Sequence, residues 1–228
     1  MALSNQYNFN PGLGEIVLYS YNRAGVRNTA IVQEHMEAAR MAANMVNADM
    51  SNKGVNLWQV TLETQPLTPG VSTYPVDPSV VVILDAYITI SEGTSNIDRY
   101  ILPVSRTEYA SYPNKEQVGF PTTYWHDRLL APTVTLWPVD PNADTFNYYV
   151  VKQLQDANYV NGQQVDIPYL WLKAWSDALS VELAVIWNPE RLTFLVPMAA
   201  ASYQTAADQN VEQAQFYISP TVSGYWRP

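Results

Sequence analysis

The chain has 228 residues, of which 47% are hydrophobic and only 14% are charged, and its formal net charge at pH 7 is −9. This length suits one domain, or one domain with a large insertion, and it is enough to bury a substantial core. The acidic balance argues against nucleic-acid binding by phosphate neutralisation. The absence of cysteine excludes disulfides and zinc sites built on thiolates.

The ends of the chain are expected to be extended arms outside the core. Residues 1–11 are polar, and residues 219–228 show no helical pattern. Trp, Tyr and Arg are the residue types that contribute most to binding energy at protein interfaces. The candidate contacts with a partner protein are therefore in the arms, at Tyr7, Phe9, Tyr225, Trp226 and Arg227. Such arms can become ordered as they wrap a neighbouring subunit, although a disordered C-terminal end is an equal alternative.

Two helices are expected after the N-terminal arm. The first covers residues 12–24 and is ended by Gly25, which can adopt the left-handed conformation of a helix C-terminus. The second begins at an N-cap provided by Thr29 and continues to about Lys53. Apolar residues recur in it at steps of three and four, which predicts one apolar face. Several alanines make this helix slim, so another helix can pack closely against it.

Residues 55–164 have the features of a β-rich module. Short runs of β-branched and aromatic residues alternate with turns marked by glycine and proline. The continuous apolar run at 80–84 predicts a strand that is buried on both faces. A hairpin is expected to follow it. Thr133–Trp137 and 146–151 are expected to form the last pair of strands.

Two further helices are expected in residues 165–218. The third main helix begins near Pro168, a residue that suits the first helical turn. It is apolar nearly all round, which is typical of a helix buried on several sides. Trp171 and Trp175 are therefore expected to pack inside the core. The last helix is expected over about 192–217.

Together these elements predict an α+β protein whose core is a bundle of about four helices from the two ends of the chain. The expected divisions are 1–54 for the N-terminal arm and helices, 55–164 for the inserted β-rich module, 165–218 for the C-terminal helices, and 219–228 for the extended tail.

The residues show no catalytic, metal-binding or cofactor-binding pattern. Two histidines are too few for a three-histidine metal site, and neither accompanies a nucleophile motif. His35 is expected to be solvated on a polar helix face, and His126 is not expected to be catalytic. Asp140, Asn142 and Asp144 alternate as in a calcium loop but lack its glycine and its glutamate, so a turn is expected there. We therefore expect a protein that is not an enzyme and that needs no cofactor.

The middle of the chain carries an ordered series of short motifs, and the C-terminal helices continue it. The series comprises Leu57-Trp58, Arg106 with Glu108 and Tyr109, Gly119-Phe120-Pro121, Tyr124, Leu136-Trp137-Pro138, Pro168-Tyr169, Glu182-Leu183-Ala184 and Asn188-Pro189-Glu190. In this order the motifs resemble those of the head-to-tail adaptor (connector, head-completion) proteins of short-tailed bacteriophages. The chain departs from this family in size, because its β-rich insertion is long, and its tail Tyr225-Trp226-Arg227 matches no part of the family's pattern.

The resemblance implies a structural virion protein that is made in the host cytoplasm and located at the neck between head and tail. Proteins of this family form a ring of identical subunits under the portal protein, extend the DNA channel and provide the attachment platform for a downstream tail or nozzle protein. By this resemblance we expect twelve copies, with DNA passing through the lumen without specific binding and without contact with a membrane. A closed ring requires head-to-tail contacts between subunits.

Two other functions stay open on the sequence alone. Seven tryptophans and sixteen tyrosines, against five phenylalanines, also suit a carbohydrate- or receptor-binding tail module. Such modules are usually pure β-sandwiches, however, and this chain has helices on both sides of its strands. Carboxylates that pair only in the folded chain would allow a virion-associated cell-wall hydrolase.

Overall fold

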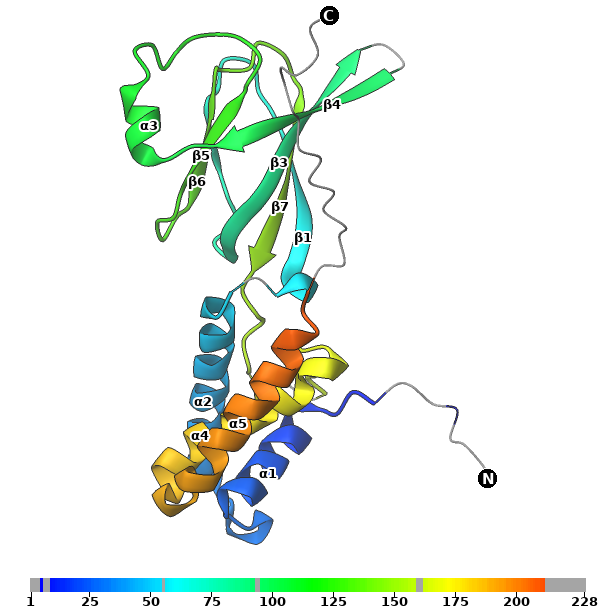
Figure 1. The fold of residues 1–228 in the computed structure, drawn as a ribbon, viewed down its shortest axis with the longest axis vertical. Helices are drawn as coiled ribbons and strands as arrows, with labels where there is room; N and C mark the ends of the chain where they lie inside the picture. Colours follow the sequence, from blue (N-terminus) through cyan, green and yellow to red (C-terminus); the bar gives the residue numbers. More distant parts are fainter. Residues whose placement is uncertain (1–4, 6–8, 55, 93–94, 159–161, 212–228) are drawn as a thin grey trace, which may run out of the picture.

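The computed structural model describes residues 5, 9–54, 56–92, 95–158 and 162–211. It shows an elongated molecule with the strands at one end and most of the helices at the other (Figure 1). The protein is therefore a mixed α+β protein, which confirms the class predicted from the sequence.

One end of the molecule is built from helices that pack around α4. The long helices of this helical part are α1 (Leu13–Ala24), α2 (Gln33–Asn52), α4 (Leu172–Trp187) and α5 (Leu192–Asp208). The short 3₁₀ turns beside them are η1 (Asn28–Ala30), η2 (Leu57–Gln59), η3 (Tyr169–Trp171) and η4 (Pro189–Arg191). Helix α4 contacts α1, α2 and α5. Its Trp175, Leu179 and Leu183 are almost completely buried, which confirms that Trp175 is a core residue.

The helix boundaries confirm some predictions and correct others. Gly25 ends α1 with a φ of 88°, as expected for a glycine after a helix. Thr29 is not the N-cap of α2, because it lies in η1 and the cap position is taken by Val32. Helix α4 also begins later than predicted, because the residues after Pro168 form η3 before the α-helix starts. Helix α5 ends at Asp208, earlier than predicted, and the last part of the predicted helix lies outside the described residues.

The other end of the molecule is a single curled seven-stranded sheet with the order β1-β7-β3-β4-β5-β6-β2. Its elements are β1 (Val60–Pro66), β2 (Thr73–Pro75), β3 (Val80–Glu92), β4 (Ser95–Pro103), the short helix α3 (Arg106–Ser111), β5 (Thr123–Asp127), β6 (Thr133–Trp137) and β7 (Thr145–Lys152). Neighbouring strands are antiparallel except for β4 and β5. The predicted hairpin is confirmed, because Glu92 of β3 pairs with Ser95 of β4.

The prediction that β6 and β7 pair is wrong. Strand β7 lies between β1 and β3, whereas β6 lies between β5 and β2. The segment 138–144 between them crosses from one side of the curled sheet to the other instead of forming a hairpin turn. The two strands that follow each other in the sequence therefore belong to opposite parts of the sheet.

Strand β3 is also less buried than its apolar sequence predicted. Val80 and Ile83 are buried, but the residues around them keep part of their surface exposed. The pairing of β3 with β7 shifts register between Val80 and Val82 and again between Ile83 and Asp85. Such irregularities twist a strand and break its regular alternation, so the run at 80–84 is not covered on both faces.

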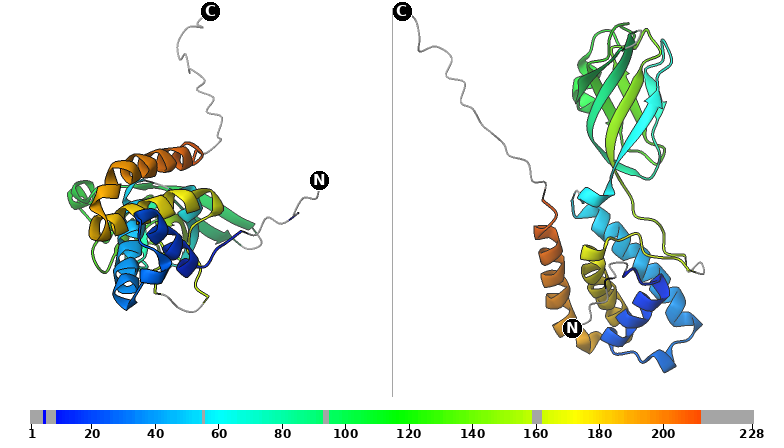
Figure 2. Two further views of the ribbon diagram at one scale, coloured as in Figure 1. Left: turned by 90° about the horizontal axis from the view of Figure 1, so that it is seen from below. Right: turned by 90° about the vertical axis from the view of Figure 1, so that its right-hand side faces the viewer.

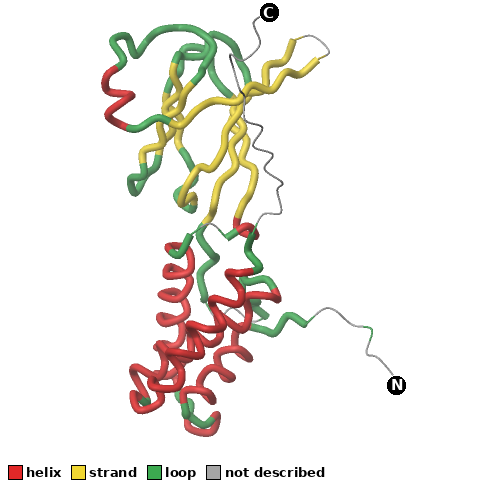
Figure 3. The backbone as a smooth tube through the Cα atoms, viewed as in Figure 1, coloured by secondary structure: helices red, strands yellow, loops and turns green. Residues whose placement is uncertain are grey.

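Two segments of the chain join the helical part to the sheet, as the green tube in Figure 3 shows between the red and yellow parts. The outgoing segment follows α2, and the returning segment follows β7. Asn44 of α2 donates a hydrogen bond to the carbonyl of Ala157 (3.2 Å) and accepts one from its N–H (2.9 Å). The part of the returning segment at Ala157 is therefore fixed along α2.

Candidate functional site

The surroundings of His35 differ from the prediction. Its ring stacks on Trp187 at the end of α4, with the ring centroids 3.9 Å apart. The hydroxyl of Tyr21 in α1 donates a hydrogen bond to the His35 carbonyl. His35 is half-buried rather than solvated, because the first turn of α2 packs against the ends of α1 and α4. The histidine thus joins three helices at one end of the helical part.

His126 and the Asp140 loop are placed in the sheet and show no metal-binding arrangement. His126 is half-buried in β5, and burial lowers its pKa. Asp140 is buried, and its carboxylate accepts hydrogen bonds from the N–H groups of Asn142 (3.2 Å) and Asp144 (3.4 Å), so the predicted turn is confirmed. Within the part of the chain that the structure describes, no group of three or more His, Asp or Glu side chains is placed to hold a metal ion.

The motif-rich middle stretch folds into an aromatic cluster that attaches α3 to the sheet. Tyr109 of α3 stacks on Trp125 of β5, with ring centroids 5.4 Å apart. Tyr112, directly after α3, stacks on Trp137 of β6 at 4.2 Å, and the Trp137 Nε1 donates to the carbonyl of Asn114 (2.9 Å). The stacked faces of these four rings therefore cover one another. The rings hold α3 and the residues after it against the sheet.

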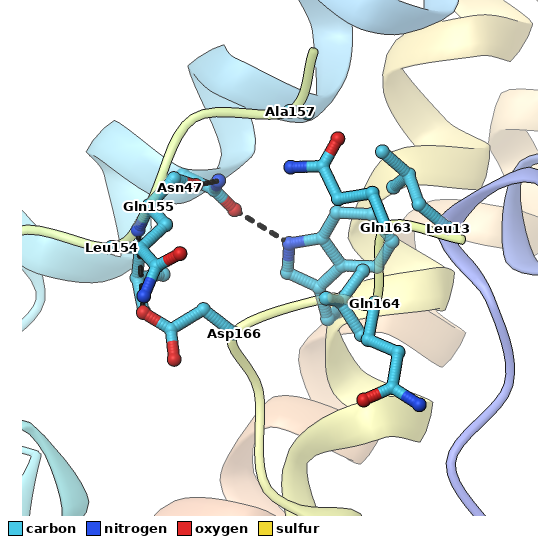
Figure 4. Close-up of a pocket in the computed structure, with 10 residues that line it drawn as sticks. Leu13, Asn47, Leu154, Gln155, Ala157, Gln163, Gln164 and Asp166 are labelled. Carbon is cyan, nitrogen blue, oxygen red and sulfur yellow. Dashed lines mark hydrogen bonds between the residues drawn. The ribbon is translucent and has the colours of Figure 1, made fainter. Parts of the chain in front are cut away.

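A small cavity between α2 and the returning segment is the next candidate, and Figure 4 shows its lining. Asn47 accepts a hydrogen bond from Trp175 Nε1 (2.8 Å) and donates one to the carbonyl of Gln155 (3.0 Å). The Asp166 carboxylate accepts from the Gln155 N–H (3.3 Å). The cavity volume is about 10 Å³, which is room for about one water molecule. This place is a polar junction between chain segments rather than a ligand site.

A longer depression runs along the helical part between α1 and α5, with α4 at its base. It consists of three adjoining hollows of about 620, 750 and 440 Å³. They are continuous because they share side chains: Tyr19 lines the first two, Met198 lines the second and third, and Leu170 and Lys173 line the first and third. We call this depression the α1–α5 groove. Its apolar lining includes Phe9, Tyr19, Tyr169, Leu170, Phe194 and Met198, and its charged lining is Glu15, Arg23, Lys173, Glu190 and Arg191.

The apolar side chains of the groove are unusually exposed. Tyr169, Leu170 and Phe194 have exposed fractions of 69%, 67% and 73%. Phe9, one of the predicted partner contacts, lies at the edge of the groove, with its ring edge-on to Tyr169 at 6.4 Å between centroids. The other predicted contacts, Tyr7 and the residues 225–227, lie outside the described residues. Contiguous apolar surfaces of this kind mark protein–protein contacts or ligand grooves.

A buried ion pair fixes α1 against α4 beneath the groove. The Asp177 carboxylate lies 2.5 Å from the Arg23 guanidinium and 2.7 Å from the Lys173 ammonium, and the Asp177 side chain is only 1% exposed. The Ser20 hydroxyl donates to the carbonyl of Ser176 across the same contact (3.2 Å). These bonds fix one side of the groove, α1, against its base, α4, so this part of the groove is a preformed feature of the fold.

The lower end of the groove is formed where α1 ends and α4 turns into α5. The Arg191 guanidinium donates a hydrogen bond to the carbonyl of Arg23 (3.3 Å). Gly25 lies close to this contact, because a Cβ atom added there would be 2.9 Å from Nε of Arg191 and 2.7 Å from Nδ2 of Asn188. The close approach brings Arg23 and Arg191 together at this end of the groove, where Glu190 also lies.

Tyr169, Leu170 and Phe194 of the groove were not among the partner contacts predicted from the sequence. The helix predicted from Pro168 onward is apolar nearly all round, so its residues were expected in the core. A signal was present in α5, where Phe194 and Met198 are one turn apart and Leu195 begins a different face. Two apolar faces on one helix indicate a second surface to be covered.

The groove has the form of a site for an apolar helix or an extended apolar segment. No family model matches the chain, and no curated protein matches it. Among the described helices, none combines the length and the apolar character that crossing a membrane would require.

Proposed function

We propose that this protein is a structural virion protein, the head-to-tail adaptor of a tailed bacteriophage. In this proposal, the helices from the two ends of the chain are the bundle core of each subunit. Identical subunits, twelve by the family resemblance, form a ring under the portal protein. The ring extends the DNA channel and provides the attachment platform for the downstream tail or nozzle protein.

The observation that carries this proposal is the α1–α5 groove. It places three large apolar side chains, each at least 67% exposed, along one side of the helical part. Exposed apolar surface of this extent favours a protein that is covered by partners in its working state. A ring subunit needs such a surface, because each copy must bind its neighbours.

The charge of the chain fits a subunit that surrounds DNA without binding it. The formal net charge is −9, and a negative wall repels the phosphate backbone, so a duplex can slide along it. The aromatic stack around α3 gives no support to a carbohydrate-binding tail module, because its rings are used to cover one another.

The experiment is electron microscopy of the purified protein, alone and mixed with the portal ring of the same virus. We expect an added ring of density coaxial with the portal, from which the number of copies can be counted. Free monomers that do not bind the portal would overturn the proposal. In that case glycan binding, followed by tryptophan fluorescence, and cell-wall hydrolysis would be the activities to measure.

A further inference from the structure

Helix α2 has an exposed apolar ridge. Its residues Ala38, Met41, Met45 and Ala48 lie on one face at helical spacing, and Met41 and Met45 are 55% and 56% exposed. The opposite face of the same helix is buried in the core through its other alanines and Val46. We call these four residues the α2 ridge. Helix α2 therefore has two apolar faces, of which only one is covered by the residues that the structure describes.

The α2 ridge and the α1–α5 groove lie on opposite sides of α4. Lys173 lines the groove, whereas Trp175 donates a hydrogen bond to Asn47 of α2 (2.8 Å). Residues two positions apart in an α-helix, such as these two, are separated by about 160° around its axis. Figure 2 agrees with this geometry, because α2 and α5 lie on different sides of α4 in the view from below. A convex and a concave apolar surface on opposite sides are what a head-to-tail contact between identical copies needs.

The two surfaces also match in charge at the same level of the molecule. Glu34 and Glu37 are exposed in the first turns of α2, and the lower end of the groove carries Arg191. The stacking of His35 on Trp187 places the start of α2 beside the end of α4, just before Arg191 in the chain. Among the described residues, Glu34, Glu37 and Arg191 take part in no ion pair.

One further pair of charges near this level is complementary as well. Arg40 is exposed on α2, and Glu190 lies beside Arg191 at the lower end of the groove. When two copies stand side by side with parallel long axes, the α2 side of one copy and the groove of the other each carry positive and negative side chains at this level. Charge patterns of this kind set the register of a contact more than its strength.

We propose that the α2 ridge of one copy docks into the α1–α5 groove of the next copy. The inference rests on the proposed function, since it names the contact that would join the subunits of the adaptor ring. Met41 and Met45 insert between α1 and α5, and the flexible methionine side chains adapt to the exposed rings of Tyr19 and Phe194. Glu34 and Glu37 then lie against Arg191 of the neighbour. Because the two surfaces differ, the contact repeats from copy to copy and closes only as a ring.

The absence of cysteine permits a direct test by cross-linking of the full chain. The variant Met45→Cys/Met198→Cys has one thiol on the ridge and one in the groove, on opposite sides of α4. A short bismaleimide is expected to join these thiols between copies and to produce a ladder of multimers, both at high protein concentration and on the portal ring. Each single variant lacks the second thiol and is expected to give no ladder. The variant Val118→Cys/Met198→Cys, with an exposed thiol in the sheet instead, is the matched control.

A charge exchange tests the register of the contact. Arg191→Glu is expected to reduce the ladder of the double-cysteine variant about tenfold, and Glu37→Arg in the same chain is expected to restore it. A misfolded chain would not regain the ladder when a second charge is exchanged. The two variants together therefore distinguish loss of the contact from loss of the folded structure.

The results also separate this inference from the proposed function. A ladder that is lost and restored by the charge exchange supports the contact. If the portal carries an added ring but the double-cysteine variant gives no ladder, the contact is wrong and the adaptor function stands. If no ring forms with or without the portal, the adaptor function itself is overturned.

Discussion

The buried carboxylate of Asp177 is expected to be one of the most important single groups for stability. Its side chain is 1% exposed, and the Arg23 side chain that it neutralises is only 15% exposed. Asp177→Ala would leave the Arg23 guanidinium buried without a counter-charge. Removal of one partner from a buried ion pair typically costs about 3–5 kcal/mol. Loss of the second contact adds little, because the Lys173 side chain is 66% exposed.

The free energy of unfolding can be measured by urea titration, followed by tryptophan fluorescence. The matched control is Glu63→Ala, which removes the partner of Lys152 in a pair of similar length, 2.6 Å, whose side chains are both 32% exposed. That change is expected to cost at most about 1 kcal/mol, since water already screens the pair. An equal m-value in all variants would show that the difference is one of stability.

The reasoning is refuted if Asp177→Ala costs no more than Glu63→Ala. A second variant, Arg23→Met/Asp177→Leu, removes both charges and replaces them with apolar side chains of similar size. It is expected to recover most of the lost stability, because apolar replacements of buried ion pairs are often neutral or better. A double variant as unstable as Asp177→Ala would show that packing rather than the unpaired charge sets the cost.

Two further predictions concern the same helical end and the sheet. Gly25→Ala is expected to lower the free energy of unfolding by at least about 1 kcal/mol, because Gly25 has a φ of 88° and a new Cβ would lie 2.7 Å from Nδ2 of Asn188 and 2.9 Å from Nε of Arg191; an unchanged urea midpoint would contradict this. Burial raises the pKa of Tyr21 and that of Tyr124 from 10.0 to about 12, so the folded state favours the protonated phenols. Their contribution to stability is fully present below pH 10 and is lost as the pH rises through 12. Urea titrations below pH 10 and near pH 12 should show this loss, and Tyr124→Phe should make it smaller; a loss of the same size in the variant would argue against the burial effect.

The sequence was a good guide wherever a local signal determines the backbone. The end of α1 followed from Gly25, since few other residues adopt a positive φ there. The start of α2 did not follow from Thr29, because the chain uses that residue in the turn η1 and caps the helix without a side-chain hydrogen bond. A typical capping residue favours a helix start but does not fix its position. In this chain α2 packs against α1 and α4 and begins at Gln33, four residues after Thr29.

The strand pairing and the groove depend on contacts between distant residues. Neighbouring strands in sequence usually pair, so nothing local indicated that β6 and β7 belong to different parts of the sheet. The groove was hidden for a related reason: an apolar helix predicts burial, but periodicity does not say whether the covering partner is in the same chain. Leu170 and Phe194 have the same residue types as the core and differ from it only in what surrounds them.

The chain enters the sheet at the start of β1 and leaves it at the end of β7, and these two points are neighbours. Val60, the first residue of β1, pairs with Val151 near the end of β7, and paired residues of antiparallel strands lie about 5 Å apart. A segment whose two ends adjoin can be lengthened, shortened or exchanged without a change in the path of the flanking chain. The region from β1 to β7 can therefore be replaced as a unit. A protein with the same helices could hold a sheet of another size at this position, and the packing between its helices would not change.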